Sequence, residues 1–467
     1  MNRKSLLFFT SWFLIFTFRL TAQNTWIQTY QPFGDVDYFV EDVIICQDEG
    51  YAINGYYYYY DSFPPPIEEQ FGFLMKTDSN GNFEWSEVDN NVGFEWNQSS
   101  AFVETDDEGF LCSVYSDYGG SVLVKRDSEG NQQWVESCGD LFIHSMDNTS
   151  DGDIILGGRM NGLPAIRKIT QEADIYWTQT YYIQGSGSGC IKSIISLTDN
   201  GYAVTGWESS NGGDVLIMKT DANGDSLWTK TFDGYGDFDQ GKSISEGLGG
   251  KLVLSGDLVD QTNFIINGLI WLFDAFGNTI FNEIAEINTG FGHYSIICLP
   301  YDSFTTFCYI GNNQSKIYNF DSGYNIEWES IFDCVIARGD RGFLNTSDSY
   351  VCSGVTEINW DEYIALIKTD SLGQYVYIDE YEITPLQTTL NYYPNPFNPI
   401  INFEIKSDDI FDLKLRIFNV KGQLVKTIPI TGQKISWDAS GFASGIYLCN
   451  VQKNQEIIQS KKITLMK

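Results

Sequence analysis

The 467-residue sequence has little histidine and few basic residues. Its two histidines, His144 and His293, remove most zinc sites and most histidine-based acid–base chemistry. Only 28 Lys and Arg stand against 62 Asp and Glu, and the resulting net charge of −34 repels phosphate backbones. We therefore expect no nucleic-acid partner. No apolar run after residue 18 is long enough to cross a bilayer, so the mature chain is expected to lack a transmembrane segment.

A regular cysteine framework is also missing. The nine cysteines are an odd number without a C-x-x-C pair, so an exported protein would keep at least one free thiol. Several lie in apolar, strand-like runs, which favours buried thiols that act as small hydrophobic residues. A disulfide between Cys298 and Cys308 across one hairpin stays open as an alternative.

The N-terminus has the pattern of an export signal. Arg3 and Lys4 precede an apolar run over residues 6–18, and Ala22 offers a small residue before a cleavage point. Thirteen apolar residues suit a signal-peptide core better than a membrane span. The sequence thus predicts a signal peptide over residues 1–22, with an uncleaved anchor as the alternative.

A repeat of about 49 residues fills the middle of the chain. The phrase Lys219–Gly224, followed by Trp228, recurs three times clearly and three times weakly. In every copy the aromatic residue stands seven positions after the anchor, and the anchors are residues 78, 127, 170, 221, 274, 321 and 370. The residues that define the repeat are Asp78, Gly81, Trp85, Asp127, Gly130, Trp134, Trp177, Asp221, Gly224, Trp228, Trp328, Asp370 and Gly373.

Each unit holds four short strands separated by glycine turns. The Asp at the anchor suits the start of a type I turn, and the Gly takes the positive φ that follows. Seven such units predict an all-β, seven-bladed β-propeller over residues 23–384, with the aromatic residue packed on the next blade. A strand-only solenoid is the alternative. Residues 25–30 resemble a lone last strand that would close the ring, but residues 375–381 offer another, so closure stays open.

The units resemble those of exported bacterial propeller proteins with the pattern "GY(A/I)xxG … KTDxxGxxxW". The resemblance covers residues 24–384. That class has no common catalytic residues, so the resemblance implies a structural role for the repeated Asp, Gly and Trp and nothing more.

The last eighty residues differ in composition. Residues 385–467 hold ten Lys and Arg but six Asp and Glu, and residues 1–22 hold three basic residues, so residues 23–384 carry −41. Such a break indicates a separate domain. Its short alternating strands, such as residues 413–418, predict a small immunoglobulin-like β-sandwich over residues 388–467.

A motif opens this region, and further marks follow it in order. They are Tyr393, Pro394, Asn395, Pro396, Phe397, Asn398 and Pro399, then Gly422, Gly445, Tyr447 and Lys462. Together they resemble the type A C-terminal sorting domain of type IX secretion cargo. The resemblance implies recognition by the type IX secretion machinery and delivery to the outer surface of a Gram-negative bacterium, or release from it. An immunoglobulin-like module with its own ligand is the alternative.

Two segments resemble cofactor-binding motifs. Residues 236–243 match a phosphate-loop pattern, but they join two expected propeller strands and include Asp237 and Asp239, which would repel phosphate. Residues 147–153 match half a calcium loop, but Gly158 stands where the bidentate Glu belongs. We predict no cofactor, while calcium binding by other acidic loops stays open.

Aromatic insertions are the best candidates for a ligand surface. They comprise Tyr56, Tyr57, Tyr58, Tyr59 and Tyr60, with Trp207 and Trp360 at corresponding places in two other units. A strand end with a rigid proline hairpin tip is the structural alternative for residues 56–66. The leading hypothesis is non-catalytic binding or adhesion, to polysaccharide or another surface protein. The alternatives are a carbohydrate-active hydrolase or lyase with carboxylates in the propeller funnel, and a structural surface-layer component. Paired carboxylates on inner-strand ends with raised pKa would favour the enzyme.

Overall fold

The computed structural model describes most of the chain between residues 25 and 467. The described ranges are 25–33, 36–61, 67–89, 98–116, 120–183, 185, 187–209, 213–234, 238–260, 265–285, 293–299, 302–311, 314–332, 335–336, 343–346, 349–358, 361–374, 389–406, 413–419, 421, 423–430, 434–453 and 456–467. The expected signal peptide, Cys334, Trp360, residues 375–381 and Gly422 lie outside them. The chain divides into two compact units, residues 1–376 and 377–467.

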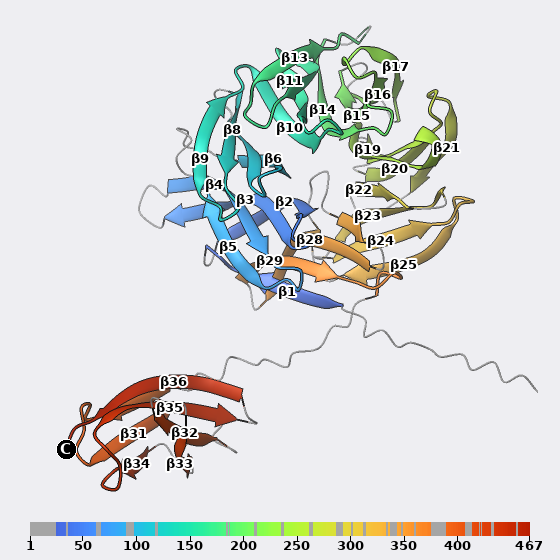
Figure 1. Ribbon diagram of the computed structural model, residues 1–467. Helices are drawn as coiled ribbons and strands as arrows, with labels where there is room; N and C mark the ends of the chain where they lie inside the picture. The colour runs from blue at the N-terminus through green and yellow to red at the C-terminus, as the bar shows by residue number, and fades with distance from the viewer. Residues whose placement is uncertain are drawn as a thin grey trace, which may run out of the picture. The chain divides into compact units, whose positions relative to one another are not determined.

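Seven sheets form the first unit and stand in a ring (Figure 1), which confirms the predicted seven-bladed propeller. Blade one consists of β2 (Asp37–Ile45), β3 (Tyr51–Asp61), β4 (Ile67–Thr77) and β5 (Phe83–Val88). Blade two consists of β6 (Gln98–Glu104), β7 (Phe110–Ser116), β8 (Gly120–Arg126) and β9 (Gln132–Ser137). Blade three consists of β10 (Leu141–Asn148), β11 (Ile154–Met160), β12 (Leu163–Ile169) and β13 (Ile175–Thr180).

The next three blades repeat this antiparallel order. Blade four consists of β14 (Gly189–Ser196), β15 (Tyr202–Glu208), β16 (Asp214–Thr220) and β17 (Ser226–Phe232). Blade five consists of β18 (Gln240–Glu246), β19 (Leu252–Asp260), β20 (Ile265–Phe273) and β21 (Thr279–Ala285). Blade six consists of β22 (His293–Cys298), β23 (Phe304–Gly311), β24 (Gln314–Phe320) and β25 (Ile326–Phe332).

Blade seven joins the two ends of the propeller. It contains β26 (Val335–Ile336), β27 (Phe343–Thr346), β28 (Ser349–Ile358), β29 (Asp361–Lys368) and the N-terminal β1 (Trp26–Tyr30). β1 pairs antiparallel with β29, with Trp26 opposite Lys368 and Tyr30 opposite Ile364. The question left open by the sequence is thus answered, because the N-terminal strand closes the ring.

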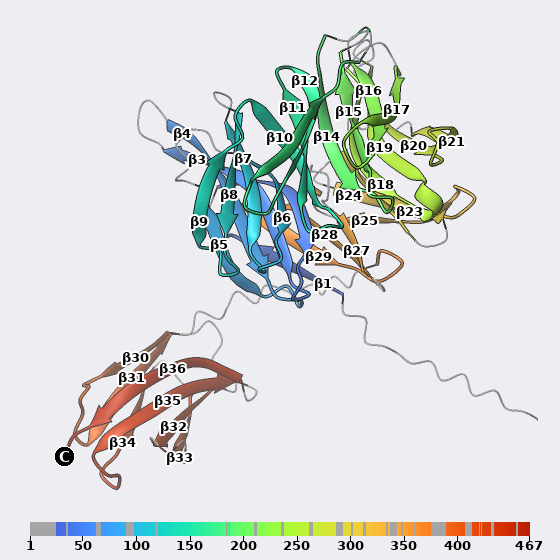
Figure 2. The ribbon, with the colours of Figure 1, turned by 45° about the horizontal axis from the view of Figure 1, so that its top comes forward.

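Alternation along each strand fills the spaces between blades. In β15, Ala203 packs in the cluster shared with blade five, whereas its neighbour Val204 packs in the cluster shared with blade three. Figure 2 shows the sheets of blades three and four standing side by side. Because neighbouring blades cover both faces of a blade, its central strands have nearly continuous apolar sequences.

The strand order gives the propeller two different faces. The turn face carries the turns between the first and second and between the third and fourth strands of each blade, such as residues 46–50 and 78–82. The loop face carries the connections between the second and third strands and those between blades, such as residues 209–213 and 233–239 in blade four.

The second unit is a small sandwich of two sheets. One sheet has the order β30 (Thr389–Tyr393), β31 (Ile400–Lys406), β34 (Lys434–Asp438), and the other β33 (Leu424–Pro429), β32 (Lys414–Asn419), β35 (Gly445–Lys453), β36 (Glu456–Leu465). One buried cluster, including Phe397, Phe403, Trp437 and Tyr447, fills the space between them.

The disulfide considered between Cys298 and Cys308 does not form. Both thiols are free, because β22 pairs with β23 so that Cys298 faces Phe304 while Cys308 faces His293. The register places the two cysteines at opposite ends of the strand pair. Burial raises the pKa of each thiol to about 12, which keeps both of them unreactive.

Candidate functional site

The repeated Asp and Gly residues build the turn face. In blade one, Asp78 Oδ1 accepts the backbone N–H of Asn80 and of Asn82, both at 2.8 Å. The same pair of bonds recurs at Asp127, Asp221, Asp274, Asp321 and Asp370. The glycines Gly81, Gly130, Gly224, Gly277 and Gly373 have positive φ. These carboxylates stabilise the turns by accepting backbone hydrogen bonds, and we therefore assign them a structural role.

The repeated aromatic residues make the joints between blades. A Cβ at Gly130 would lie 2.8 Å from the ring of Trp85, whose Nε1 also donates to the Ser128 carbonyl at 3.2 Å. The same docking recurs for Trp177 on Gly224, Trp228 on Gly277, Trp328 on Gly373 and Trp26 on Gly81. Trp134 and Ala173 pack against one cluster, and the Phe281 ring lies 5.1 Å from that of Tyr324. This aromatic row is structural.

Lysines on the third strands add ion pairs to the turn face. Lys76 lies 2.6 Å from Asp48, Lys125 lies 2.7 Å from Asp107, and Lys219 lies 2.7 Å from Asp199. Lys168 pairs with Asp151 in the same way. Partial burial raises the pKa of Asp107, but hydrogen bonds from Lys125, Thr105 and Gly109 outweigh it and lower that pKa to about 2. The lysine of the repeat therefore ties two turns together.

The carboxylates at the inner-strand ends are also occupied. Glu104 accepts the backbone N–H of Gln47 at 2.7 Å, and Asp147 accepts that of Ser196 at 2.9 Å. Each of these bonds links two neighbouring blades. Asp147 and Asp151 belong to the segment that resembles half a calcium loop, and both are engaged within the protein. Within the described ranges, no group of three His, Cys, Asp or Glu is arranged to hold a metal ion.

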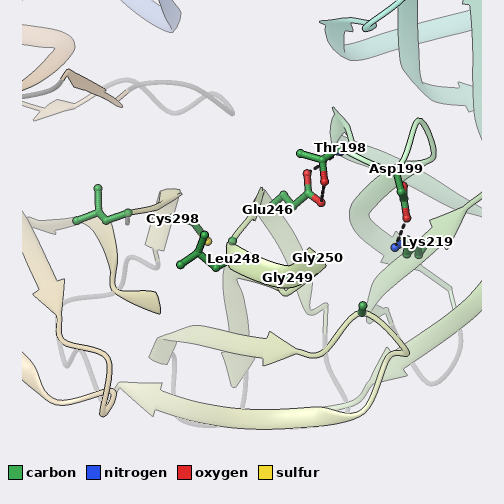
Figure 3. Close-up of a pocket in the computed structure, with 11 residues that line it drawn as sticks. Thr198, Asp199, Lys219, Glu246, Leu248, Gly249, Gly250 and Cys298 are labelled. Atoms are coloured by element: carbon green, nitrogen blue, oxygen red, sulfur yellow. Dashed lines mark hydrogen bonds and ion pairs between the residues drawn. The ribbon is translucent and has the colours of Figure 1, made fainter. Parts of the chain in front are cut away.

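A pocket of about 630 Å³ opens on the turn face where blade five departs from the repeat (Figure 3). The turn between the first and second strands of blade five includes the short 3-10 helix η2 (Leu248–Gly250) and has Gly249 at the place where blade four has Asp199. The remaining lining residues include Thr198, Lys219, Glu246, Ala275, Cys298 and Leu299.

The polar groups of this pocket are paired with one another. Glu246 accepts the backbone N–H and the hydroxyl of Thr198, both at 2.8 Å, and Asp199 holds Lys219. Figure 3 shows both contacts as dashed lines at the pocket rim. A hollow whose polar groups are engaged in this way offers a ligand mainly the exposed side chain of Leu248. The sequence reasoning missed this pocket, for which the run of glycines over residues 247–250 was the available signal.

The aromatic candidates of blade one lie on a strand and not in a loop. β3 includes Tyr56 to Tyr60, and the side chains of Tyr59 and Tyr60 lie outside the described residues. Tyr57 points into the core and stacks on Phe33 at 4.8 Å. Tyr56 stacks on Phe39 at 4.9 Å with an interplanar angle of 5°, and Tyr58 meets Phe39 edge-on at 5.5 Å.

Phe39, Tyr56 and Tyr58 form a half-buried group that we call the blade-one aromatic triad. Sequence reasoning missed Phe39, because only the pairing of Phe39 with Tyr56 in the sheet reveals it.

Trp207 lies near the loop-face end of β15. Its ring lies 5.3 Å from that of Phe238, which follows in the connection to blade five. Tyr182, 74% exposed in the connection between blades three and four, adds a further aromatic residue to this face. Trp360 lies outside the described residues. The loop face therefore presents aromatic side chains on more than one blade.

The structure also pairs two carboxyls that no spacing rule had singled out. Glu208 and Asp214 are partners in the register of β15 and β16, and their side chains are only 1% and 5% exposed. Asp214 Oδ1 is buried without a hydrogen-bond partner. Burial first, and then the charges of Glu208, Asp233 and Asp239, raise the pKa of Asp214 to about 6. We call Glu208 and Asp214 the blade-four carboxyl pair.

In the second unit, the motif over residues 393–399 forms hydrogen bonds with residues 464 and 466. Asn395 Oδ1 accepts the backbone N–H of Thr464 at 2.8 Å. Phe397 donates its N–H to the Thr464 carbonyl and accepts that of Met466, both at 2.9 Å, and its ring is buried beside Trp437. The exposed motif residues include Tyr393, Pro394, Pro396 and Asn398.

The other marks of this unit divide between core and surface. Tyr447 donates its hydroxyl to the Ala443 carbonyl at 2.7 Å and packs edge-on against Trp437. Gly445 has φ +154, while Pro399 is half-buried and Lys462 is exposed. The structure thus brings together the two ends of the unit, which the sequence separates by about seventy residues.

This second unit matches a known family. Residues 391–466 match the secretion system C-terminal sorting domain, so this part of the chain is a sorting domain of the type IX secretion system. The domain marks the chain as secreted cargo of that system, attached to the outer cell surface or released from it. Within the described residues, no helix has the length and apolar character to cross a membrane.

The propeller resembles other solved propellers. PorZ of Porphyromonas gingivalis, described as an essential bacterial surface component of the type IX secretion system, is 14% identical with a TM-score of 0.42 over 88% of this chain and 58% of that chain. The Dos1 propeller is 12% identical with a TM-score of 0.46 over 72% and 86%, and Sqt1 from Chaetomium thermophilum is 10% identical with a TM-score of 0.42 over 74% and 100%.

The aligned region thus spans little more than half of PorZ, and at these identities the likeness says nothing about ligand or activity. No curated protein sequence matches this chain.

Proposed function

We propose that the propeller is a non-catalytic binding module that type IX secretion delivers to the cell surface, and that its loop face binds polysaccharide. The observation that carries the proposal is the blade-one aromatic triad, in which stacked and half-buried rings lie side by side on β2 and β3. Flat aromatic faces offer a large apolar area at little cost in side-chain entropy, and such faces suit the C–H face of a sugar ring.

A hydrolytic activity finds less support. A glycosidase needs two carboxyl groups that flank a bond of the substrate and are open to it. Within the blade-four carboxyl pair, Asp214 has the raised pKa that such chemistry uses, but Glu208 and Asp214 are only 1% and 5% exposed and lie on the second and third strands of the blade. A polysaccharide chain cannot reach them while the blade keeps this packing. No observation on the described residues favours a surface-layer role.

Binding measurements on the full chain test the ligand surface. The variant Y56A/Y58A removes two rings of the triad, and we expect its Kd for a retained polysaccharide to rise about tenfold or more, since each lost aromatic contact costs roughly 1 kcal/mol. The matched control is F276A, because Phe276 is 82% exposed on the turn face. Equal effects of both variants, or no effect of Y56A/Y58A, would contradict the proposal.

Fractionation of cells tests delivery. Deletion of residues 388–467 should leave the protein in the periplasm. The variant N395A, which removes the acceptor for the Thr464 N–H, should lower the surface fraction, whereas K421A at an exposed turn should not. Surface delivery of the truncated chain would contradict the role given to the sorting domain.

A further inference from the structure

The first strands of six blades share a β-bulge at the same level. In each of them the pairing with the second strand skips one residue of the first strand. From blade one to blade six, the skipped residues are Glu41, Ser100, His144, Lys192, Lys242 and Tyr294. Figure 1 shows β2, β6, β10, β14 and β22 on the inner side of the ring. A bulge leaves its extra residue unpaired and re-aims the side chain, and bulges are common next to functional sites.

In blade four, the extra residue belongs to neither covered face of the sheet. Ile191 and Ile194 of β14 pack in the cluster shared with blade three. Between them, Ser193 Oγ accepts the Ile244 N–H of blade five at 3.2 Å. The alternation of the strand thus omits Lys192, which is half-buried on the edge strand of its sheet. The bulge therefore sets Lys192 at the inner edge of the blade.

Blade three brings two further nitrogen-bearing side chains to the same place. Ser145 Oγ accepts a backbone N–H of β14 at 3.1 Å, so the bulge at His144 lies beside the bulge at Lys192. Arg159 is opposite Phe142 in the β10–β11 register, and its guanidinium lies 5.3 Å from the centre of that ring. Burial first, and then the charges of Lys192 and Arg159, hold the pKa of His144 well below its usual range. We call His144, Arg159 and Lys192 the inner basic cluster.

The positive charges of this cluster have no carboxylate partner among the described residues. Lys242, the bulge residue of blade five, lies 3.3 Å from the Asp257 carboxylate. By contrast, no carboxylate of the described ranges is at ion-pair distance from Lys192 or Arg159. Residues 23–384 carry −41, so two uncompensated cations side by side depart from the rest of the propeller. The overall charge disfavours a polyanion, but the cluster suits one anionic group on a neutral ligand.

We propose that the inner basic cluster binds the carboxylate of an acidic sugar residue in an otherwise neutral polysaccharide. The guanidinium of Arg159 offers a fork of N–H donors that matches a carboxylate, and Lys192 adds a point charge. Each first strand begins at the loop face, and Lys192 is the fourth residue of β14, so the cluster lies in the loop-face half of the inner strands. The inference rests on the proposed function for the polysaccharide and adds the kind of sugar that is recognised.

Histidine NMR of the purified full chain tests the cluster. The chain has two histidines, so the imidazole signals of His144 can be assigned with the variant H144Q. The probes are D-glucuronate and D-galacturonate, and the controls are D-glucose, D-galactose and acetate. We expect both acids to move the His144 signals and to raise its pKa, because a bound carboxylate offsets the charges of Lys192 and Arg159. Their Kd should be at least about tenfold lower than that of any control.

Two variants and a matched control make the result specific. K192M and R159M each keep an unbranched side chain but remove one charge, and each should raise the Kd of the two acids about tenfold. K230M removes a lysine charge from the exposed face of β17 and should change that Kd by less than about twofold, since solvent and salt screen a distant charge.

Three outcomes would overturn the inference. The first is an equal Kd for the acids and the neutral sugars, and the second is an unchanged Kd in K192M. The third is acetate binding as tight as that of the acids, since the cluster would then hold a free anion and not a sugar. Polysaccharide retention that depends on Tyr56 and Tyr58 would leave the proposed function standing in all three cases. Loss of that retention with intact binding of the acids would count against the aromatic surface alone.

Discussion

The turn face and the loop face end the same strands, but their polar groups are arranged differently. On the turn face, Asp78 and its equivalents accept two backbone N–H groups each, and Asp107 is paired with Lys125. On the loop face, burial and the charges of Glu208, Asp233 and Asp239 raise the pKa of Asp214. The comparison indicates that the repeat is conserved between blades where it holds the ring together, and that the other end is free to carry different residues in different blades.

The largest expected difference concerns two tryptophans. W85A removes a ring that packs on Gly130 of the next blade, so we expect it to lower the free energy of unfolding by about 3 kcal/mol. W207A, whose ring contacts Phe238 at the loop face, should cost about 1 kcal/mol and instead weaken polysaccharide binding. Denaturant unfolding and binding assays on both variants check this. Equal losses of stability would erase the distinction between the faces.

A pair of glycines separates backbone strain from a steric clash. Gly130 has φ +85 and a Cβ there would lie 2.8 Å from Trp85, whereas Gly139 on the loop face has φ +61 and nothing within 4 Å. G139A should cost about 1 kcal/mol through strain alone. G130A should cost roughly 2–3 kcal/mol, since the ring must also move. Thermal unfolding of both variants gives the difference, and a G139A effect as large as that of G130A would contradict it.

The smallest expected effect is the pH dependence of the free energy of unfolding, which has opposite signs for Asp107 on the turn face and Asp214 on the loop face. The pKa of Asp107 is lowered from 3.8 to about 2, so its stabilising contribution is complete above pH 3.8 and is lost as pH falls toward 2. The side chain is 54% exposed, so screening limits this contribution to at most about 1 kcal/mol. The raised pKa of Asp214 acts in reverse and removes stability as pH rises toward about 6.

Unfolding curves of the wild type, D107N and D214N from pH 2 to pH 8 check both signs. D107N should flatten the acidic limb, and D214N should flatten the limb between pH 4 and pH 7. A change by either variant in the limb assigned to the other residue would contradict these two assignments.

The sequence predicted the features that are local. Seven copies of an Asp turn with an aromatic residue seven positions later were enough for the blade number, because a short turn and its strands are encoded by neighbouring residues. Ring closure was not local. Residues 25–30 and 375–381 both had the pattern of a last strand, and the choice depends on pairing between β1 and β29.

The remaining features of the candidate site depend on strand register, which the sequence alone did not show. Glu208 and Asp214 are six positions apart, and only the β15–β16 pairing makes them opposite partners. Phe39 joins the blade-one aromatic triad through its pairing with Tyr56. The hydrogen bond from the Thr464 N–H to Asn395 links the two ends of the sorting domain. The sequence had marked residues near each end, but it did not predict that they are in contact.

One assay on the full chain distinguishes a binding propeller from a catalytic one. The purified full chain is applied to a panel of bacterial, algal and plant polysaccharides, and both retention and new chain ends are measured on the same samples. The account predicts retention on at least one polysaccharide, dependence of that retention on Tyr56 and Tyr58, and no increase in chain ends. New chain ends that scale with the amount of protein would contradict it, because the propeller would then be an enzyme.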